Sequence, residues 1–94
     1  MHAVFGTVEI EADRVAESET MLKEQLLPRV KDFPGFISGT WTRSMDDTQG
    51  RSLILFDNEE SAQAAIEAAK EMAPPPGAPI KFGTFELFQV VTQA

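Results

Sequence analysis

The segment spanning residues 33–60 constrains the fold most strongly, because it sets the order of several neighbouring elements. It begins with Phe33-Pro34-Gly35-Phe36, where proline removes a backbone donor and glycine accepts turn conformations, so a preceding helix must end there. Two strand-like runs, residues 36–44 and 52–56, flank the stretch Asp46-Asp47-Thr48-Gln49-Gly50, whose composition is typical of a turn. The segment therefore predicts a β-hairpin.

One strand and one helix are predicted before this hairpin. Residues 4–11 alternate between apolar and polar side chains, as a half-buried strand does. Residues 13–32 repeat apolar side chains at helical spacing. Pro28 lies inside this helical pattern, and we expect it to kink the helix or to shorten its last turns.

A second helix and a fourth strand are predicted after the hairpin. Asp57 and Glu60 have the spacing of a capping box, so Asp57 is the expected N-cap. The apolar positions of residues 62–72 are mostly alanine, and small side chains allow a helix to lie close to a sheet. The proline-rich residues 74–79 cannot be helical and form a stiff connection to a long strand at residues 80–91.

These elements follow the order β-α-β-β-α-β. That order is the ferredoxin-like arrangement, an α+β fold in which a four-stranded antiparallel sheet carries both helices on one face. A chain of 94 residues has the size of one domain, so residues 1–94 are expected to form a single domain with a thin core.

Composition and charge exclude several classes of function. The net charge is −7 and the cationic side chains are scattered, which argues against binding to a phosphate backbone, so no nucleic-acid partner is expected. No apolar run approaches the roughly 20 residues needed to span a bilayer, and the N-terminus lacks the features of a signal peptide. The chain contains no cysteine, hence neither a disulfide framework nor thiolate chemistry. We expect a cytoplasmic protein without a membrane partner.

Two helices cover only one face of the predicted sheet, yet both faces carry large apolar side chains. Residues 53–56 are all large and apolar, although neighbours on a strand point to opposite faces. On the last strand, strict alternation groups Phe82 with Phe88. It leaves Phe85 and Leu87 on the opposite face. Because a contiguous apolar surface marks an interface, we expect a homodimer through the sheet face. The alternative is a monomer with an unusually apolar sheet.

The chain resembles the dimeric α+β barrel superfamily, and most closely its antibiotic-biosynthesis-monooxygenase-like domains. The resemblance covers nearly the whole chain, from a first strand with a short acidic exit to the last strand. Its most distinctive parts are the hinge Phe33-Pro34-Gly35-Phe36, the hairpin over Asp46-Asp47, and the strand Leu53-Ile54-Leu55-Phe56-Asp57 that runs into Asn58-Glu59-Glu60-Ser61-Ala62. The resemblance implies a homodimer whose sheets form a barrel, with a cleft between sheet and helices in each subunit.

Members of this superfamily oxygenate polycyclic aromatic substrates without a metal or flavin, or they degrade heme. The heme-degrading branch uses an asparagine on the first strand, a tryptophan at the end of the third and a histidine on the second helix. The corresponding strand positions here are Gly6 and Phe56, and no histidine follows His2. The resemblance therefore argues against heme degradation of that type, and no cofactor is expected.

Trp41 and Arg43 are the strongest candidates for catalytic residues. An indole in a cleft offers a stacking surface and one donor, although Trp41 could equally fill the core or the dimer barrel. The register of the hairpin is not readable from the sequence, so the face that Trp41 takes stays open. Arg43 shares that face and could hold an enolate or a carboxylate, or it could pair with surface carboxylates.

Further residues are expected to line the cleft. Glu86 would be a partly buried base with a raised pKa if it shared a face with Phe82 and Phe88, and otherwise lies in water. A single histidine, His2, with scattered carboxylates does not make a metal site. The full set of expected lining residues is Gly6, Val8, Leu22, Leu26, Phe56, Ile66 and Glu86.

Two functions remain open at this point. The first is a cofactor-independent monooxygenase that acts on a small aromatic or quinone-like molecule, which Trp41 and Arg43 would position for reaction with O₂. The second is a non-catalytic dimeric barrel that binds a small apolar ligand or has a regulatory or structural role. The absence of tyrosine and of a second histidine favours the second on chemical grounds, whereas the resemblance favours the first.

Overall fold

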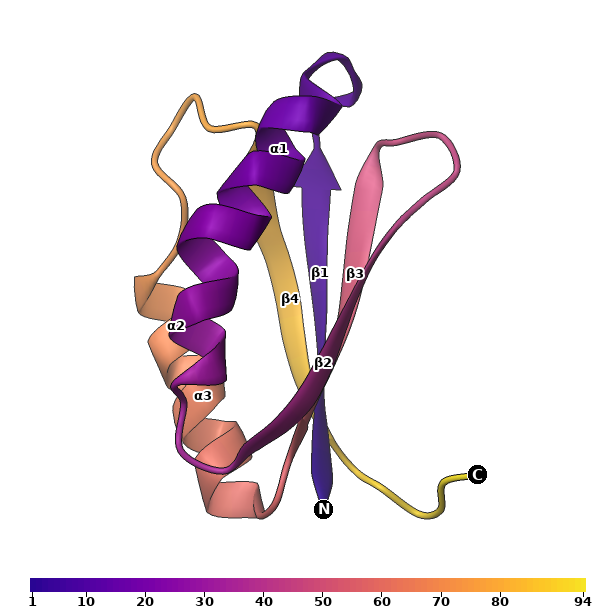
Figure 1. Cartoon of the computed structure of the whole chain (residues 1–94), viewed down its shortest axis with the longest axis vertical. Helices are drawn as coiled ribbons and strands as arrows, with labels where there is room; N and C mark the ends of the chain where they lie inside the picture. Colours follow the sequence, from indigo (N-terminus) through magenta and orange to yellow (C-terminus); the bar gives the residue numbers. More distant parts are fainter.

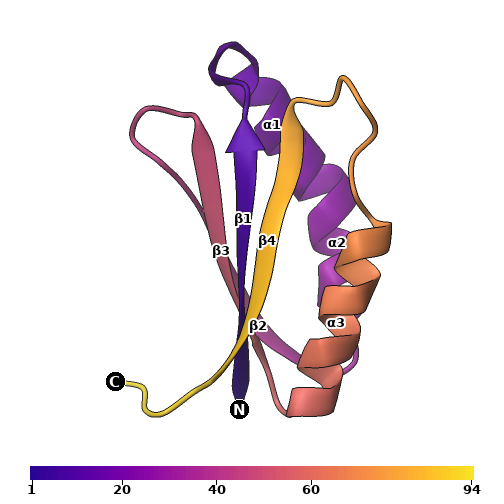
Figure 2. The ribbon, with the colours of Figure 1, turned by 180° about the vertical axis from the view of Figure 1, so that it is seen from behind.

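The sheet contains the four predicted strands, and all of them pair antiparallel. A computed structural model describes residues 1–94 (Figure 1). It contains four strands, β1 (His2–Ile10), β2 (Phe36–Arg43), β3 (Gln49–Phe56) and β4 (Ile80–Gln89). They form one antiparallel sheet in the order β2-β3-β1-β4. The expected ferredoxin-like α+β fold is therefore confirmed. Both termini lie at the same end of the sheet (Figure 2).

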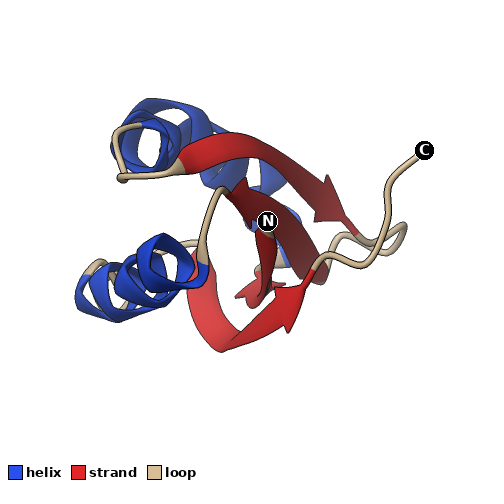
Figure 3. Ribbon diagram, turned by 90° about the horizontal axis from the view of Figure 1, so that it is seen from below, coloured by secondary structure: helices blue, strands red, loops and turns tan.

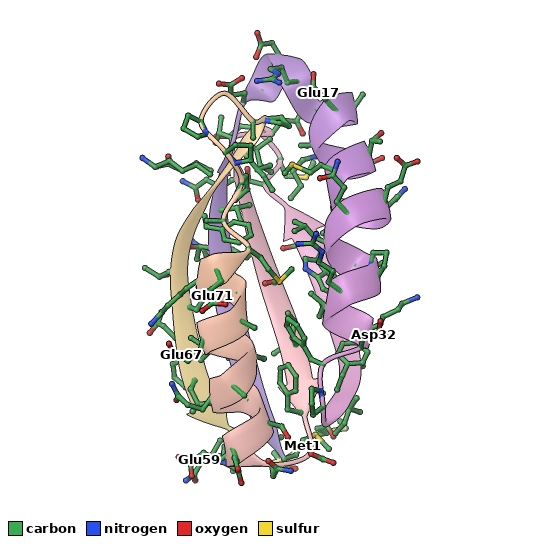
Figure 4. All side chains as sticks on the ribbon, turned by 90° about the vertical axis from the view of Figure 1, so that its left-hand side faces the viewer. Met1, Glu17, Asp32, Glu59, Glu67 and Glu71 are labelled. Atoms are coloured by element: carbon green, nitrogen blue, oxygen red, sulfur yellow. The ribbon has the colours of Figure 1, made fainter.

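The helices form a second layer on one face of the sheet (Figure 3). The first helical segment consists of a 3-10 turn η1 (Ala12–Arg14), helix α1 (Val15–Met21), a π-helical turn η2 (Leu22–Leu26) and helix α2 (Leu27–Lys31). Helix α3 (Glu59–Glu71) runs beside it, and Glu59 and Glu71 mark its two ends in Figure 4. Helix α3 contacts β1, β3 and β4, whereas α2 contacts β2.

Pro28 explains why the first helical segment is interrupted by a wide turn. The ring of a helical proline clashes with the carbonyl four residues earlier, and proline has no N–H to bond it. In this chain the backbone widens over Leu22–Leu26, directly before Pro28, and the N–H of Leu27 donates to the carbonyl of Leu22. The predicted distortion is confirmed, and it takes the form of a π-helical turn.

Gly35 lies in the turn between α2 and β2, and it contacts the start of α3. Its φ of +75° lies in the left-handed region, where glycine is favoured. A Cβ at this position would also lie 2.5 Å from Asp57 Oδ1, so only glycine fits. The Gly35 carbonyl accepts a 2.9 Å hydrogen bond from the Asp57 N–H. The predicted cap at Asp57 is wrong, because the Asn58 side chain accepts the N–H of Ser61 at 2.8 Å and caps α3 instead.

The buried core lies where α3 meets the central strands. Phe56 is 1% exposed and is the largest fully buried side chain. Val4 from β1 and three α3 residues pack around it, namely Ala62, Ala65 and Ile66. The small alanine side chains let α3 lie close to the sheet.

A β-bulge near the middle of β4 changes which side chains share a face. Gly6 pairs with Phe85 and Val8 pairs with Phe82, so two β4 residues lie opposite Thr7 alone. The extra residue moves Phe82 to the face that carries Phe85. The prediction that Phe82 shares a face with Phe88 is therefore wrong, because a bulge interrupts strict alternation.

The face of the sheet away from the helices is rich in exposed apolar side chains. Phe5 is 42% exposed, Leu53 38% and Phe88 49%. The Phe5 and Phe88 rings contact edge to face, with centroids 5.2 Å apart. We call the surface formed by Phe5, Leu53 and Phe88 the outer apolar face. None of the helices is long and apolar enough to cross a membrane.

Candidate functional site

A cavity of about 650 Å³ lies between the first helical segment, α3 and the sheet. Eighteen of its 30 lining residues are hydrophobic, so the interior is mostly apolar with a minority of polar groups. Both the volume and the composition are those of cavities that bind small organic molecules. Figure 4 shows the side chains of the two helical segments in front of the sheet.

The helical wall of the cavity comes from one face of the first helical segment. Ser18, Leu22 and Leu26 follow one another at four-residue spacing and all border the cavity. Ser18 is buried, and its hydroxyl donates a 2.7 Å hydrogen bond to the carbonyl of Val15. The π-helical turn lies in the middle of this wall. π-helical turns inside helices occur frequently at functional sites.

Glycines occupy three positions on the helix-facing side of the sheet, and two of them, Gly6 and Gly50, border the cavity. The three residues are Gly6 on β1, Gly39 on β2 and Gly50 on β3. At each of them, a Cβ would collide with a neighbouring side chain. A Cβ at Gly50 would lie 2.8 Å from Val8 Cγ2. A Cβ at Gly39 would lie 2.5 Å from the Trp41 ring. Glycine at these positions therefore lets neighbouring side chains, including Val8 and Trp41, lie close over the sheet.

Trp41 borders the cavity from β2. Its ring extends along its own strand toward Gly39, whose missing side chain makes space for it. Trp41 is half-buried, and its indole N–H makes no hydrogen bond within the protein. The question of which face Trp41 takes is thus answered by the structure: the side chain faces the helices rather than the outer apolar face.

Arg43 lies at the hairpin end of the cavity within a cluster of charges. Its Nη1 donates to Glu19 Oε1 at 3.1 Å, and its Nε donates to Asp47 Oδ1 at 3.0 Å. The Arg43–Glu19 pair links β2 to α1 across the cavity. Lys23 Nζ lies 3.6 Å from the other oxygen of Glu19. The hydrogen bond from Arg43, with the nearby charge of Lys23, lowers the pKa of Glu19 below its ordinary value.

The turn between β2 and β3 holds Asp47 against Arg43. Asp46 accepts hydrogen bonds from the Thr48 hydroxyl at 2.6 Å and from the Ser44 hydroxyl at 2.7 Å. These bonds lower the pKa of Asp46. Asp47 takes the left-handed conformation, with φ of +64°, which directs the chain back into β3. The hydrogen bonds within this turn therefore help to hold Asp47 beside Arg43.

The structure brings most of the expected site residues together. Trp41 and Arg43 both border the cavity, as do Gly6, Val8, Leu22, Leu26, Phe56 and Ile66. Glu86 does not, so its expected place in the lining is wrong. It pairs with Phe5 on the outer side and is exposed, because its neighbour Phe85 pairs with Gly6 and takes the cavity side.

Sequence reasoning missed Ser52. This residue lies on β3 between Gly6 of β1 and Trp41 of β2, and its hydroxyl faces the cavity. A serine among hydrophobic strand residues carries no recognisable motif. The only available signal was its position opposite Trp41, which depends on a hairpin register that the sequence leaves open.

The cavity has no histidine, cysteine or tyrosine ligand for a metal ion. The single histidine of the chain, His2, lies outside it. No group of three or more histidine, cysteine, aspartate or glutamate residues in the chain is arranged to hold a metal ion.

Comparisons with known proteins establish the fold. MhuD, a heme-degrader from Mycobacterium tuberculosis with two hemes bound in its active site, matches with a TM-score of 0.75 and 19% identity, over 100% of this chain and 99% of that chain. A proposed antibiotic biosynthesis monooxygenase from Deinococcus radiodurans matches with a TM-score of 0.68 and 12% identity, over 100% and 96%.

A third similar structure holds an organic ligand. It is a monooxygenase from the gene ActVA-Orf6 of Streptomyces coelicolor in complex with the ligand nanaomycin D, with a TM-score of 0.58, 16% identity and coverage of 99% and 91%. No family model matches the sequence, and no curated protein does. The chain thus has the fold of antibiotic-biosynthesis-monooxygenase-like domains. Sequence identities this low support a shared fold and not a shared activity.

Proposed function

We propose that this chain is a cofactor-independent monooxygenase-like protein whose cavity takes a small aromatic or quinone-like molecule. The observation that carries the proposal is the open, mostly apolar cavity of about 650 Å³ with Trp41 in its wall and Arg43 at one end. A filled apolar interior would have left no place for a substrate. The similar structures support the proposal, since they include a monooxygenase that holds nanaomycin D.

The proposed reaction needs no added reductant. A substrate such as anthrone has an acidic methylene carbon, and the anion formed by loss of one proton can pass electrons to O₂. One oxygen atom becomes a carbonyl at that carbon, and the other leaves as water with both methylene hydrogens. Anthrone and O₂ thus give anthraquinone and water.

Two side chains have proposed roles in this reaction. Trp41 would stack against the ring system, because an indole presents a large, flat apolar surface. Arg43 would stabilise the anionic oxygen of the substrate, because a guanidinium forms charge-assisted hydrogen bonds with such oxygens. To do so it would have to share or replace its bond to Glu19.

A second candidate function is binding without catalysis. The carboxylates at the cavity, Glu19 and Asp47, both accept hydrogen bonds from Arg43. The lowered pKa of Glu19 makes it a weak base. This observation favours a non-catalytic role in which the cavity binds an apolar ligand, with a regulatory or structural purpose.

We also expect the chain to form a homodimer through its outer apolar face. Phe5, Leu53 and Phe88 are exposed there, and adjacent large apolar side chains on one face mark an interaction surface. Light scattering at low micromolar concentration tests this expectation. A Phe88→Glu variant should be monomeric, and a wild-type chain that is already monomeric would contradict it.

Oxygen consumption separates the two candidate functions. Anthrone is added to the protein in an oxygen electrode, and the rate is compared with that of anthrone in buffer. Protein-dependent uptake that is lost in Trp41→Ala supports the monooxygenase. Saturable binding without uptake, across a panel of anthrones and quinols, supports the non-catalytic barrel. Glu86→Gln is the matched control, because Glu86 lies away from the cavity and should leave both readouts unchanged.

A further inference from the structure

We infer that the Ser52 hydroxyl is the hydrogen-bonding group that orients the ligand in the cavity. The ligand class is thereby narrowed to flat, mostly apolar molecules that carry a carbonyl or hydroxyl oxygen on the ring system. The inference rests on the proposed function in one respect, that the cavity binds an aromatic molecule.

Ser52 occupies the centre of the cavity floor. It lies on β3, one of the two central strands, and pairs with Gly6 on one side and with Trp41 on the other. Directly paired residues in an antiparallel sheet have their side chains on the same face, with Cβ atoms about 5 Å apart. A ligand that stacks on Trp41 would therefore have its edge within reach of the Ser52 hydroxyl.

The Ser52 hydroxyl stands out because it has no partner in the protein. Every other hydroxyl that borders the cavity is hydrogen-bonded. Thr42 donates to the Arg51 carbonyl at 2.7 Å, and Thr7 pairs with Thr84 at 3.1 Å. Ser18 and Ser44 are bonded as well. Ser52 alone among them makes no side-chain hydrogen bond, and it faces the cavity.

The surroundings of Ser52 are mostly apolar, so its hydroxyl is the polar group that a ligand on this part of the cavity floor would meet. Its neighbour along the same face of β3 is Ile54, and Phe85 lies close by on β4. Serine is not among the residues favoured in strands. A valine or threonine would suit the strand better, so a small hydroxyl here points to a binding role.

Gly6 keeps the hydroxyl accessible. A Cβ at Gly6 would lie 2.7 Å from Ser52 Oγ and 3.3 Å from the Phe85 ring. Any larger residue at this position would cover the hydroxyl from the β1 side. Because Gly6 pairs with Ser52, the Ser52 hydroxyl stays accessible from the cavity among mostly apolar neighbours.

The test compares two ligands that differ by one oxygen. Anthrone and 9,10-dihydroanthracene share a three-ring frame, and only anthrone has a carbonyl. Binding is followed by the fluorescence of Trp41, which is the only tryptophan in a chain without tyrosine. The titrations are made under nitrogen, so that binding is measured without oxygenation. The variants are Ser52→Ala and the matched pair Ser52→Thr and Ser52→Val, which have the same shape and differ in the hydroxyl.

The expected result is a preference for anthrone that depends on the hydroxyl. One net hydrogen bond corresponds to a roughly 3- to 10-fold difference in Kd, which wild type and Ser52→Thr should show. Ser52→Ala and Ser52→Val should bind both compounds with similar Kd. A preference that survives in Ser52→Ala and Ser52→Val, or that is missing in wild type, overturns the role of Ser52. If wild type binds neither compound, the proposed function fails and the inference fails with it.

Discussion

Replacing Phe56 with alanine should destabilise the fold more than any other single truncation in the sheet. Phe56 is the largest fully buried side chain, at 1% exposure. It contacts the Phe36 ring edge to face, with centroids 6.4 Å apart, and packs against Ala62 and Ile66 of α3. The substitution removes this contact and leaves a void between α3 and the sheet.

The expected loss can be set against the total stability. Truncation of a buried phenylalanine to alanine costs about 3–5 kcal/mol. At roughly 0.05–0.15 kcal/mol per residue, a chain of 94 residues has a free energy of unfolding of about 5–14 kcal/mol. Phe56→Ala should therefore lose about a fifth or more of that free energy and lower Tm by at least ~12 °C. Phe56→Leu keeps most of the volume and should lose about 1.5 kcal/mol or less.

Urea unfolding followed by circular dichroism measures these losses. All variants are compared at one protein concentration, because a dimer gains apparent stability with concentration. Phe56→Ala should lower the midpoint and leave the slope of the free energy against urea unchanged. A loss below ~1 kcal/mol at an unchanged slope would show that the core does not lie where α3 meets Phe56.

Three further predictions concern the cavity. Gly39→Val should push the Trp41 ring aside, since a Cβ at residue 39 would lie 2.5 Å from the ring. We expect the fluorescence emission maximum of Trp41 to shift and the free energy of unfolding to fall by ~1–3 kcal/mol. An unchanged emission spectrum would contradict the placement of the ring. The Arg43–Glu19 pair should contribute stability above pH 4.5, the ordinary pKa of Glu19, and lose it as the pH falls through the lowered pKa. NMR titration of the Glu19 carboxyl should give a pKa below 4.5 that rises in Arg43→Gln, and equal values in both proteins would contradict the bridge. Added hemin should show no spectrum of iron ligated by histidine, thiolate or tyrosinate, since none of these side chains borders the cavity, whereas a histidine-ligated spectrum would show that His2 reaches the bound heme.

The order of the elements could be predicted because each boundary depends on local chemistry. The hinge at Pro34 and Gly35 ends a helix through restrictions on single residues, and the acidic turn before Gly50 needs no distant partner. The same is true of Pro28, whose missing N–H distorts the helix wherever it is placed. Features of this kind can be predicted from a few neighbouring residues.

Features that depend on pairing between strands could not be predicted. The bulge opposite Thr7 places Phe82 on the cavity side, whereas Glu86 and Phe88 lie on the outer side. The only local signal of the bulge was Gly83, and a glycine within a strand does not by itself fix where the register shifts. The hairpin register places Ser52 opposite Trp41, and a shift by one residue would have put these two side chains on opposite faces of the sheet. The site could therefore be predicted in outline, while its one unpaired hydroxyl became visible only in three dimensions.

The most direct test of the binding cavity is an NMR titration of the ¹⁵N-labelled protein with anthrone under nitrogen. The account predicts saturable shifts of the Trp41 indole N–H and of the backbone amides of Gly6 and Gly50, which border the cavity. The backbone amide shifts of Phe5 and Phe88, whose side chains lie on the outer apolar face, should change little by comparison. Shifts confined to Phe5 and Phe88, or no saturable shifts at all, would contradict the claim that the cavity binds an aromatic ligand.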